Sequence, residues 1–184
     1  MNIFETQLEY SLNPTDSDCL NSFYRSVFPG MMSIDNAADD RETQRSGIDK
    51  FLHFKNGSVI AIEEKKRTQD YGDVFLETWS IWEQGIRGWL FTSKADWISY
   101  YVVPSNTVYM IPVLPLRCAW HHHGDEWIAR YGERDAPNPE YTTKGVPVKW
   151  SVLSSAILTE MSGLLNGRLL SLEWNEDEII NEGV

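Results

Sequence analysis

Residues 47–67 read GIDKFLHFKNGSVIAIEEKKR, and this stretch decides the expected fold. Two segments rich in aromatic and β-branched residues, 48–54 and 59–65, flank the turn Lys55-Asn56-Gly57-Ser58. Asn-Gly between two such segments is the strongest short-range signal for a β-hairpin. The second segment starts with four apolar residues and ends in charges. This pattern predicts a strand that leaves a hydrophobic core and ends at a cleft or a sheet edge.

The charges of this hairpin predict a metal site. Alternate residues of a strand share a face, so Glu63 and Lys65 are expected to point the same way. Asp49, on the first arm, can then meet Glu63 across the hairpin. Two carboxylates held together repel unless a hard cation lies between them, and Mg²⁺ needs only one or two protein carboxylates. The pattern predicts phosphodiester hydrolysis, with Asp49 and Glu63 binding Mg²⁺ or Mn²⁺ and Lys65 assisting the attacking water.

The same residues resemble the PD-(D/E)XK nuclease superfamily, which includes restriction endonucleases, Holliday-junction resolvases and phage nucleases. The resemblance covers residues 16–113, and Ile48 stands where the motif has its name-giving proline. Asp49 matches the first acid of the motif, Glu63 its second acid and Lys65 its lysine. The resemblance implies a restriction-endonuclease-like fold and a Mg²⁺-dependent nuclease of phage or mobile-element type, with DNA as its substrate.

The doubled Glu63-Glu64-Lys65-Lys66 leaves the register of the motif open, because Glu64 and Lys66 have the same spacing as Glu63 and Lys65. We prefer Glu63 and Lys65, since the resemblance to the phage members is best in that register. It also leaves Lys66 and Arg67 to contact backbone phosphates.

Residues on both sides of the hairpin extend the resemblance. Gln44 or Glu42 fills the place of a polar residue that lies near the metal, and residues 70–77 look like the third strand of the same group. Asp73 and Glu77 share a face of that strand. One of them is a candidate for the active cleft, and cross-strand ion pairing explains both equally well.

Charge is distributed unevenly along the chain. Sixteen Lys and Arg against 27 Asp and Glu give a net charge of −11, which argues against a broad basic surface that coats nucleic acid. Residues 41–67 nevertheless form a basic island, whose bases are Arg41, Arg45, Lys50, Lys55, Lys65, Lys66 and Arg67. Such an island marks a site for an anionic ligand. We expect phosphate contacts from Lys50, Lys66 and Arg67, with Arg41 and Arg45 beside them. A solvated hairpin edge with protective lysines is the competing interpretation.

The rest of the chain predicts helices around further hairpins. Helical spacing predicts a helix that starts at residues 15–16 and ends at 29–30, and others over about 33–44, 114–131 and 151–165. Strands are expected over 73–81, 89–91, 97–103 and 108–113, and a loop over 134–145. We therefore expect one α/β (α+β) domain over residues 1–172, with a central mixed, largely antiparallel twisted sheet flanked by helices. An acidic tail over 173–184 follows.

Composition excludes several classes of protein. A chain of 184 residues buries a sizeable core without disulfides, and Cys19 and Cys118 are too few for a thiolate zinc site. The longest apolar run, residues 108–116, contains two prolines and cannot cross a bilayer. The N-terminus has no secretion signal, so a cytoplasmic location without a membrane partner is expected. A two-fold homodimer would follow if the substrate is a branched junction.

Three alternatives stay open. His121-His122-His123 with Asp125 and Glu126 suggests a metal site, but adjacent histidines on a helix point in different directions, so a structural role is favoured. Core packing is likewise favoured over base stacking for a set of large aromatics, namely Trp79, Trp82, Trp89, Trp97, Tyr100 and Tyr101. The net charge supports a second hypothesis for the function. In it, the protein is a non-catalytic binding or inhibitor protein, either a degenerate nuclease fold or an acidic DNA mimic.

Overall fold

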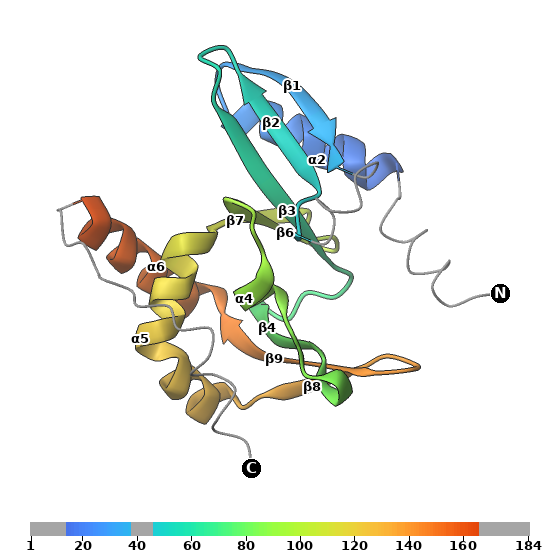
Figure 1. Cartoon of the computed structure of the whole chain (residues 1–184), viewed down its shortest axis with the longest axis vertical. Coiled ribbons are helices and arrows are strands. Elements are labelled where there is room, and N and C mark those ends of the chain that lie inside the picture. The colour runs from blue at the N-terminus through green and yellow to red at the C-terminus, as the bar shows by residue number, and fades with distance from the viewer. Residues whose placement is uncertain (1–13, 38–45, 166–184) are drawn as a thin grey trace.

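Two β-sheets and the helices around them make up this computed structural model, which describes residues 14–37 and 46–165 (Figure 1). One sheet has five strands in the order β1-β2-β3-β6-β7, and the other has four in the order β5-β4-β9-β8. The strands of the first sheet are β1 (Met31–Asn36), β2 (Lys50–Phe54), β3 (Val59–Arg67), β6 (Trp97–Val102) and β7 (Thr107–Pro112). Those of the second are β4 (Asp73–Ile81), β5 (Ile86–Arg87), β8 (Arg134–Pro137) and β9 (Thr142–Lys149). The helices are α2 (Pro14–Val27), α4 (Trp89–Thr92), α5 (Val113–Tyr131) and α6 (Trp150–Leu165), with a 3₁₀ turn η2 (Trp82–Gln84).

The five-stranded sheet is mixed, as the sequence predicts. β3 pairs antiparallel with β2 and parallel with β6, in a register that runs from Ile62 opposite Trp97 to Arg67 opposite Val102. A parallel pair requires a long crossover connection. Here β4, β5 and α4 supply it. The chain is therefore a single α+β domain in which the third predicted strand, 73–81, leaves the central sheet to start a second one.

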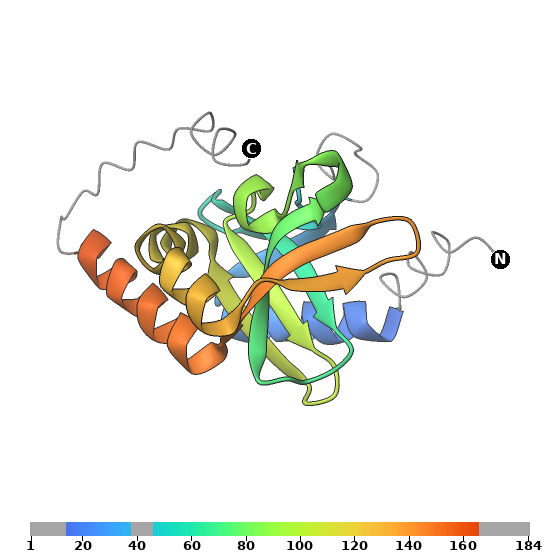
Figure 2. The same cartoon turned by 90° about the horizontal axis from the view of Figure 1, so that it is seen from below.

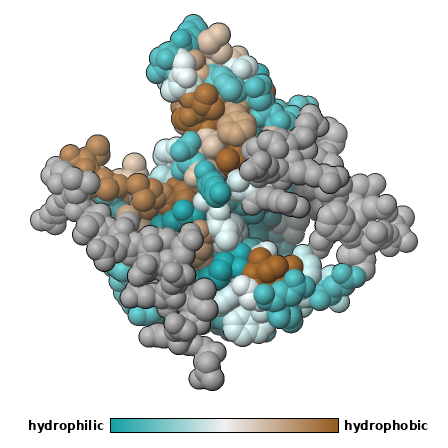
Figure 3. Space-filling view, in the orientation of Figure 1, coloured by the Kyte–Doolittle hydropathy of each residue, from teal (hydrophilic) through white to brown (hydrophobic). Residues whose placement is uncertain are grey.

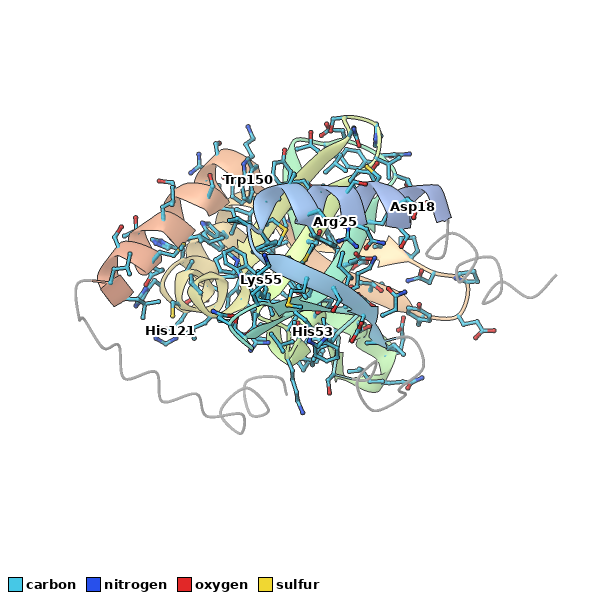
Figure 4. All side chains as sticks on the ribbon, turned by 90° about the horizontal axis from the view of Figure 1, so that it is seen from above. Asp18, Arg25, His53, Lys55, His121 and Trp150 are labelled. Atoms are coloured by element: carbon cyan, nitrogen blue, oxygen red, sulfur yellow. The ribbon has the colours of Figure 1, made fainter. Side chains whose placement is uncertain are left out.

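The two faces of β3 meet different surroundings. Ile60 and Ile62 pack on α2 around Leu20 and Tyr24. On the opposite face of the sheet, a larger core joins β6 and β7 to β4, β9, α5 and α6. Figure 2 shows α5 and α6 side by side along one flank of the sheets, and Figure 4 shows α2, marked by Asp18 and Arg25, on the other side from His53 of β2. Side chains on the two faces of β3 therefore lie in different environments.

Several predicted elements are confirmed. The hairpin forms over Lys50–Phe54 and Val59–Arg67, and β4 spans the predicted residues 73–81. The helix of residues 14–27, the hairpin of β6 and β7, and the two long helices α5 and α6 also agree with the prediction to within two residues at most ends. The acidic tail, residues 173–184, lies outside the described residues.

Two predictions in the first half of the chain were wrong. Residues 33–36 belong to strand β1 and not to a helix, because pairing with β2 packs Met31 and Ile34 against the cluster under α2. Residues 89–92 form helix α4 and not a strand. Trp89 and Leu90 are both buried, and two consecutive buried side chains fit a helix on a core better than a two-faced strand.

The predicted loop over 134–145 was also wrong. This segment contains β8 and the start of β9, which form a hairpin closed by a 2.8 Å hydrogen bond from Asn138 N–H to the Tyr141 carbonyl. The prolines that suggested a loop are compatible with these strands because β8 lies at the sheet edge, where Pro137 ends it.

Lys50 is buried under α2, which corrects its predicted role as a phosphate contact. The side chain lies in the interior with 3 % of the residue exposed. Its Nζ lies 2.7 Å from Asn21 Oδ1, 3.2 Å from Ser17 Oγ and 3.3 Å from Glu64 Oε1. Glu64 also accepts a 2.9 Å hydrogen bond from the Tyr24 hydroxyl. Lys50 is therefore a structural cation that neutralises Glu64.

We predict that Lys50→Ala lowers the free energy of unfolding by about 3 kcal/mol, because it leaves the Glu64 carboxylate without its cation in a mostly enclosed site. Urea denaturation measures the change. Lys55→Ala is the matched control, since Lys55 is an exposed lysine in the turn of the same hairpin. Equal stability of the two variants would contradict a structural role for Lys50.

Candidate functional site

Asp49 lies where the chain enters β2, next to residues 62–64 of β3. Its N–H donates to the Ile62 carbonyl at 2.8 Å, and its carbonyl accepts from the Ala37 N–H at 2.8 Å. The carboxylate also accepts the Glu64 N–H at 2.6 Å through Oδ2. The backbone thus fixes Asp49 from both sides, while the residue itself remains exposed.

Glu63 and Lys65 form a close ion pair beside Asp49. Lys65 Nζ lies 2.6 Å from Glu63 Oε1, and the Glu63 side chain is 5 % exposed against 33 % for Lys65. Burial raises the pKa of Glu63, Asp49 adds to this rise, and the Lys65 charge opposes it. Burial alone would lower the pKa of Lys65. The attraction of Glu63, with smaller contributions from Glu77 and Asp49, outweighs burial and raises that pKa.

Glu77 of β4 is the third acid of this cluster. Burial raises its pKa, while the Lys65 charge and a hydrogen bond from the Trp89 N–H oppose the rise. Asp73, the other candidate on this strand, lies 3.5 Å from Arg67 Nη2 in an ion pair. Of the two alternatives that the sequence left open, Glu77 faces the cluster and Asp73 forms the cross-strand pair.

Helix α4 closes the cluster from a direction that the sequence did not indicate. The Ser93 hydroxyl at its end hydrogen-bonds to the Glu63 carboxylate. Arg117 of α5 holds α4 in place, since its Nε donates to the Leu90 carbonyl at 2.8 Å and its Nη2 to the Ser93 carbonyl at 2.6 Å. Sequence reasoning missed Ser93 and Arg117 because neither belongs to a motif and residues 89–91 were expected to be a strand.

Gly47 lets the entry loop pass close to Glu63. Its φ is +68°, which an L side chain adopts only with strain. A Cβ at this position would lie 2.9 Å from Glu63 Oε2. The loop that carries Asp49 therefore packs directly on the Glu63 carboxylate.

The two possible registers lie on opposite faces of β3. Glu63 and Lys65 join Asp49 and Glu77, whereas Glu64 is engaged under α2 by Lys50 and Tyr24. Asp49 raises the pKa of Glu64 as well as that of Glu63, but Glu64 is neutralised by Lys50, so the Glu63–Lys65 pair is the better candidate for the site.

Cations of the basic island form ion pairs and ring contacts within the protein, which their charge alone did not predict. Arg67 pairs with Asp73, donates to the Tyr100 hydroxyl at 3.3 Å and lies over the rings of Tyr71 and Phe75. Lys66 is half-buried at the end of β3, and Lys55 is exposed at the hairpin turn (Figure 4). Arg41, Arg45, Glu42 and Gln44 lie outside the described residues.

The cluster has the donor chemistry that a hard cation needs. Glu63 Oε2 is buried and has no hydrogen-bond partner among the described residues. The adjoining side chain of Asp49 offers carboxylate oxygen at the exposed end of the cluster, and oxygen is the ligand that Mg²⁺ and Mn²⁺ prefer. Glu63 and Asp49 fit such an ion. Residues 14–37 and 46–165 contain no compact group of three or more His, Cys, Asp or Glu arranged as a metal site.

The three histidines do not converge. His122 Nδ1 lies 2.9 Å from Glu160 Oε1 of α6, and the His123 ring stacks on Trp127 with centroids 5.7 Å apart. His121 lies at the surface of α5 (Figure 4). Among the large aromatics, Trp89, Tyr100 and Tyr101 are buried in the core, as expected for packing residues.

No family model, curated protein or solved structure matches this chain. Apolar side chains gather at the surface over α6 (Figure 3), but none of the helices in the described part of the chain is long and apolar enough to cross a membrane.

We predict that Gly47→Ala destabilises the protein more than Gly57→Ala, by at least about 1 kcal/mol in the free energy of unfolding. Both glycines have positive φ, so both variants suffer the same backbone penalty of about 1–2 kcal/mol. Only the new methyl group at residue 47 meets the Glu63 carboxylate, since a Cβ at residue 57 has nothing within 4 Å. Urea denaturation of the two variants provides the comparison, and equal losses would show that the loop does not need its close approach to Glu63.

Proposed function

We propose that this protein is a metal-dependent nuclease with a restriction-endonuclease-like core, which hydrolyses phosphodiester bonds of DNA. One observation carries the proposal. The Asp49 carboxylate accepts the N–H of Glu64, the neighbour of Glu63, at 2.6 Å, and the Lys65 ammonium lies 2.6 Å from Glu63 Oε1. An arrangement of two acids and a lysine suits hydrolysis of a phosphodiester, which needs charge neutralisation and an activated water.

Asp49 and Glu63 would hold Mg²⁺ or Mn²⁺, with Glu77 beside them. Such an ion, when bound, supplies Lewis-acid chemistry that lowers the pKa of a water and neutralises phosphate charge. The raised pKa of Glu63 reflects burial first and repulsion by Asp49 as well. A cation relieves that repulsion, so the metal-free site is disposed toward one.

Lys65 acts as a cationic donor and not as a general base. The acids around it raise its pKa, so the ammonium remains protonated at neutral pH. A protonated amine cannot accept a proton from water. It can donate a hydrogen bond to a phosphate oxygen whose negative charge grows in the transition state.

The internal pairing of Lys50 and Arg67 favours a second candidate function. Lys50 and Arg67 are paired with Glu64 and Asp73, which leaves fewer cations of the basic island to contact phosphates, while the chain keeps its net charge of −11. An acidic surface fits a non-catalytic binding or inhibitor protein that mimics DNA. The two functions differ in a Mn²⁺ thermal-shift assay, because a metal site gains stability from its ion by mass action and a DNA mimic does not.

We predict that Asp49→Asn abolishes Mg²⁺-dependent DNA cleavage and the Mn²⁺ thermal shift while leaving the fold intact. The asparagine oxygen still accepts the Glu64 N–H, but the charge that binds the ion is lost. Asp96→Asn is the matched control, since Asp96 is also exposed and its Oδ2 accepts the Ala61 N–H of the same strand at 2.8 Å. Full cleavage by the Asp49 variant would overturn the assignment, and neither cleavage nor a Mn²⁺ shift in the parent would favour the binding protein.

We predict that Lys65→Ala slows the chemical step roughly 10²–10³-fold, because a donor to transition-state charge is lost. Lys66→Ala, on the opposite face of β3, should mainly weaken DNA binding. Single-turnover cleavage at saturating enzyme separates the two effects. If instead Lys66→Ala abolishes the chemical step and Lys65→Ala cleaves at the rate of the parent, the catalytic pair is Glu64 and Lys66.

A further inference from the structure

A cavity separate from the carboxylate cluster is lined by residues of four elements. Its volume is about 370 Å³, and it is bordered by β4, β5, α4 and α5. Pockets of this size hold small organic ligands. Its lining includes three aromatic side chains, one cation and two acids, namely Trp79, Phe91, Trp120, Arg87, Asp125 and Glu133.

Arg87 is held in this cavity between two rings. Its Cζ lies 4.2 Å from the centre of the Trp79 ring and 4.0 Å from that of the Phe91 ring. A guanidinium packed against aromatic rings makes its hydrogen bonds through its in-plane N–H edge. Among the described residues, Arg87 has the electrostatic attraction of Glu133 but no hydrogen-bond acceptor. A pre-oriented donor fork that lines a cavity points to a ligand with two adjacent acceptors.

The acids of the cavity restrict the kind of ligand. Glu133 accepts the Thr78 hydroxyl at 2.7 Å, which fixes its carboxylate near the cavity, and Asp125 lines it from α5. Two carboxylates beside one arginine repel a phosphate or a carboxylate. They accept hydrogen bonds from the N–H groups of a neutral ligand. The cavity therefore fits a flat neutral group with acceptors on one edge and donors on another.

We propose that this cavity binds a guanine base of the nucleic-acid substrate. Guanine presents O6 and N7 as paired acceptors, which arginine contacts in bidentate fashion, and it carries N1–H and N2–H donors on a second edge. Those donors suit Asp125 or Glu133, and the cavity offers the rings of Trp79 and Trp120 for stacking. Uracil and thymine lack the exocyclic amine that the acids would accept.

The cavity and the carboxylate cluster share two elements, which suits one strand that reaches both. Glu77 and Trp79 are two residues apart on β4. On α4, the Trp89 N–H contacts Glu77 and the Phe91 ring lines the cavity. The inference depends on the proposed nuclease function for the identity of the ligand, but it is a separate site.

Binding without metal tests the proposal. The full chain is titrated in the presence of EDTA with GMP, AMP, CMP and UMP, and with two single-stranded DNA undecamers. One undecamer is all thymidylate and the other has a single central guanine. Chemical shifts of the indole N–H groups of Trp79 and Trp120 report on the cavity. The same titrations use Arg87→Lys, which keeps the charge but loses the fork, and Arg130→Lys as its control, because Arg130 stacks on Tyr131 outside the cavity.

We expect GMP and the guanine-containing undecamer to shift both indole signals, and UMP and the all-thymidylate strand to leave them unchanged. Arg87→Lys should weaken binding about tenfold, and Arg130→Lys should not change it. Equal responses to all four nucleotides, unchanged affinity of the Arg87 variant, or binding of free GMP without the undecamer would each overturn the proposal.

The Asp49→Asn variant separates this inference from the nuclease function, because the cavity does not include Asp49. It should bind guanine like the parent. Cleavage by the parent without any indole shift would overturn the guanine site alone. Guanine binding by a parent that cleaves no DNA would overturn the nuclease function and leave the guanine site standing.

Discussion

The alternation of side chains along β3 is the constraint on which the rest of this structure depends. The strand has a sheet neighbour on each side, so its side chains point only to α2 or to the opposite face. Each face carries one glutamate and one lysine of β3. The negative charge of the buried glutamate is compensated differently on the two faces. Glu64 is neutralised by Lys50 and a tyrosine hydroxyl, and Glu63 by Lys65 at the open end of the strand. The first arrangement is enclosed and structural. The second leaves a buried oxygen without a hydrogen-bond partner within residues 14–37 and 46–165, and it carries the proposed chemistry.

Helix α4 connects the two sites proposed in this protein. It is one turn long, too short to be stable alone, and depends on tertiary contacts such as the two hydrogen bonds from Arg117. Ser93 contacts the Glu63 carboxylate from its end, and Phe91 faces the cavity with Arg87. A single guanidinium on α5 therefore helps to set the position of groups in both places.

Short sequence patterns predicted the elements of this fold that depend on neighbouring residues in the chain. The Asn-Gly turn identified the β2–β3 hairpin, and period-two alternation predicted that Glu63 and Lys65 share one face of β3. Local sequence patterns gave the wrong secondary structure where contacts between residues far apart in the chain determine it. Residues 33–36 became a strand because β2 offered a partner, and β8 and β9 formed despite their prolines because β4 has a free edge for them. The burial of Lys50 and the contributions of Ser93 and Arg117 come from tertiary packing, which no short pattern encodes.

The parallel pairing of β3 with β6 has a consequence for the order of folding. The β2–β3 hairpin closes over a four-residue turn, on the microsecond timescale of such hairpins. Its parallel neighbour is far along the chain, as the separation of 35 residues between Ala61 and its hydrogen-bond partner Asp96 shows. Closing that loop costs chain entropy before its contacts stabilise it. The hairpin alone brings Asp49 near Glu63, whereas the burial that raises the pKa of Glu63 also requires the distant elements that pack on this face of β3. The perturbed carboxylate is therefore a property of the complete tertiary fold and not of the hairpin.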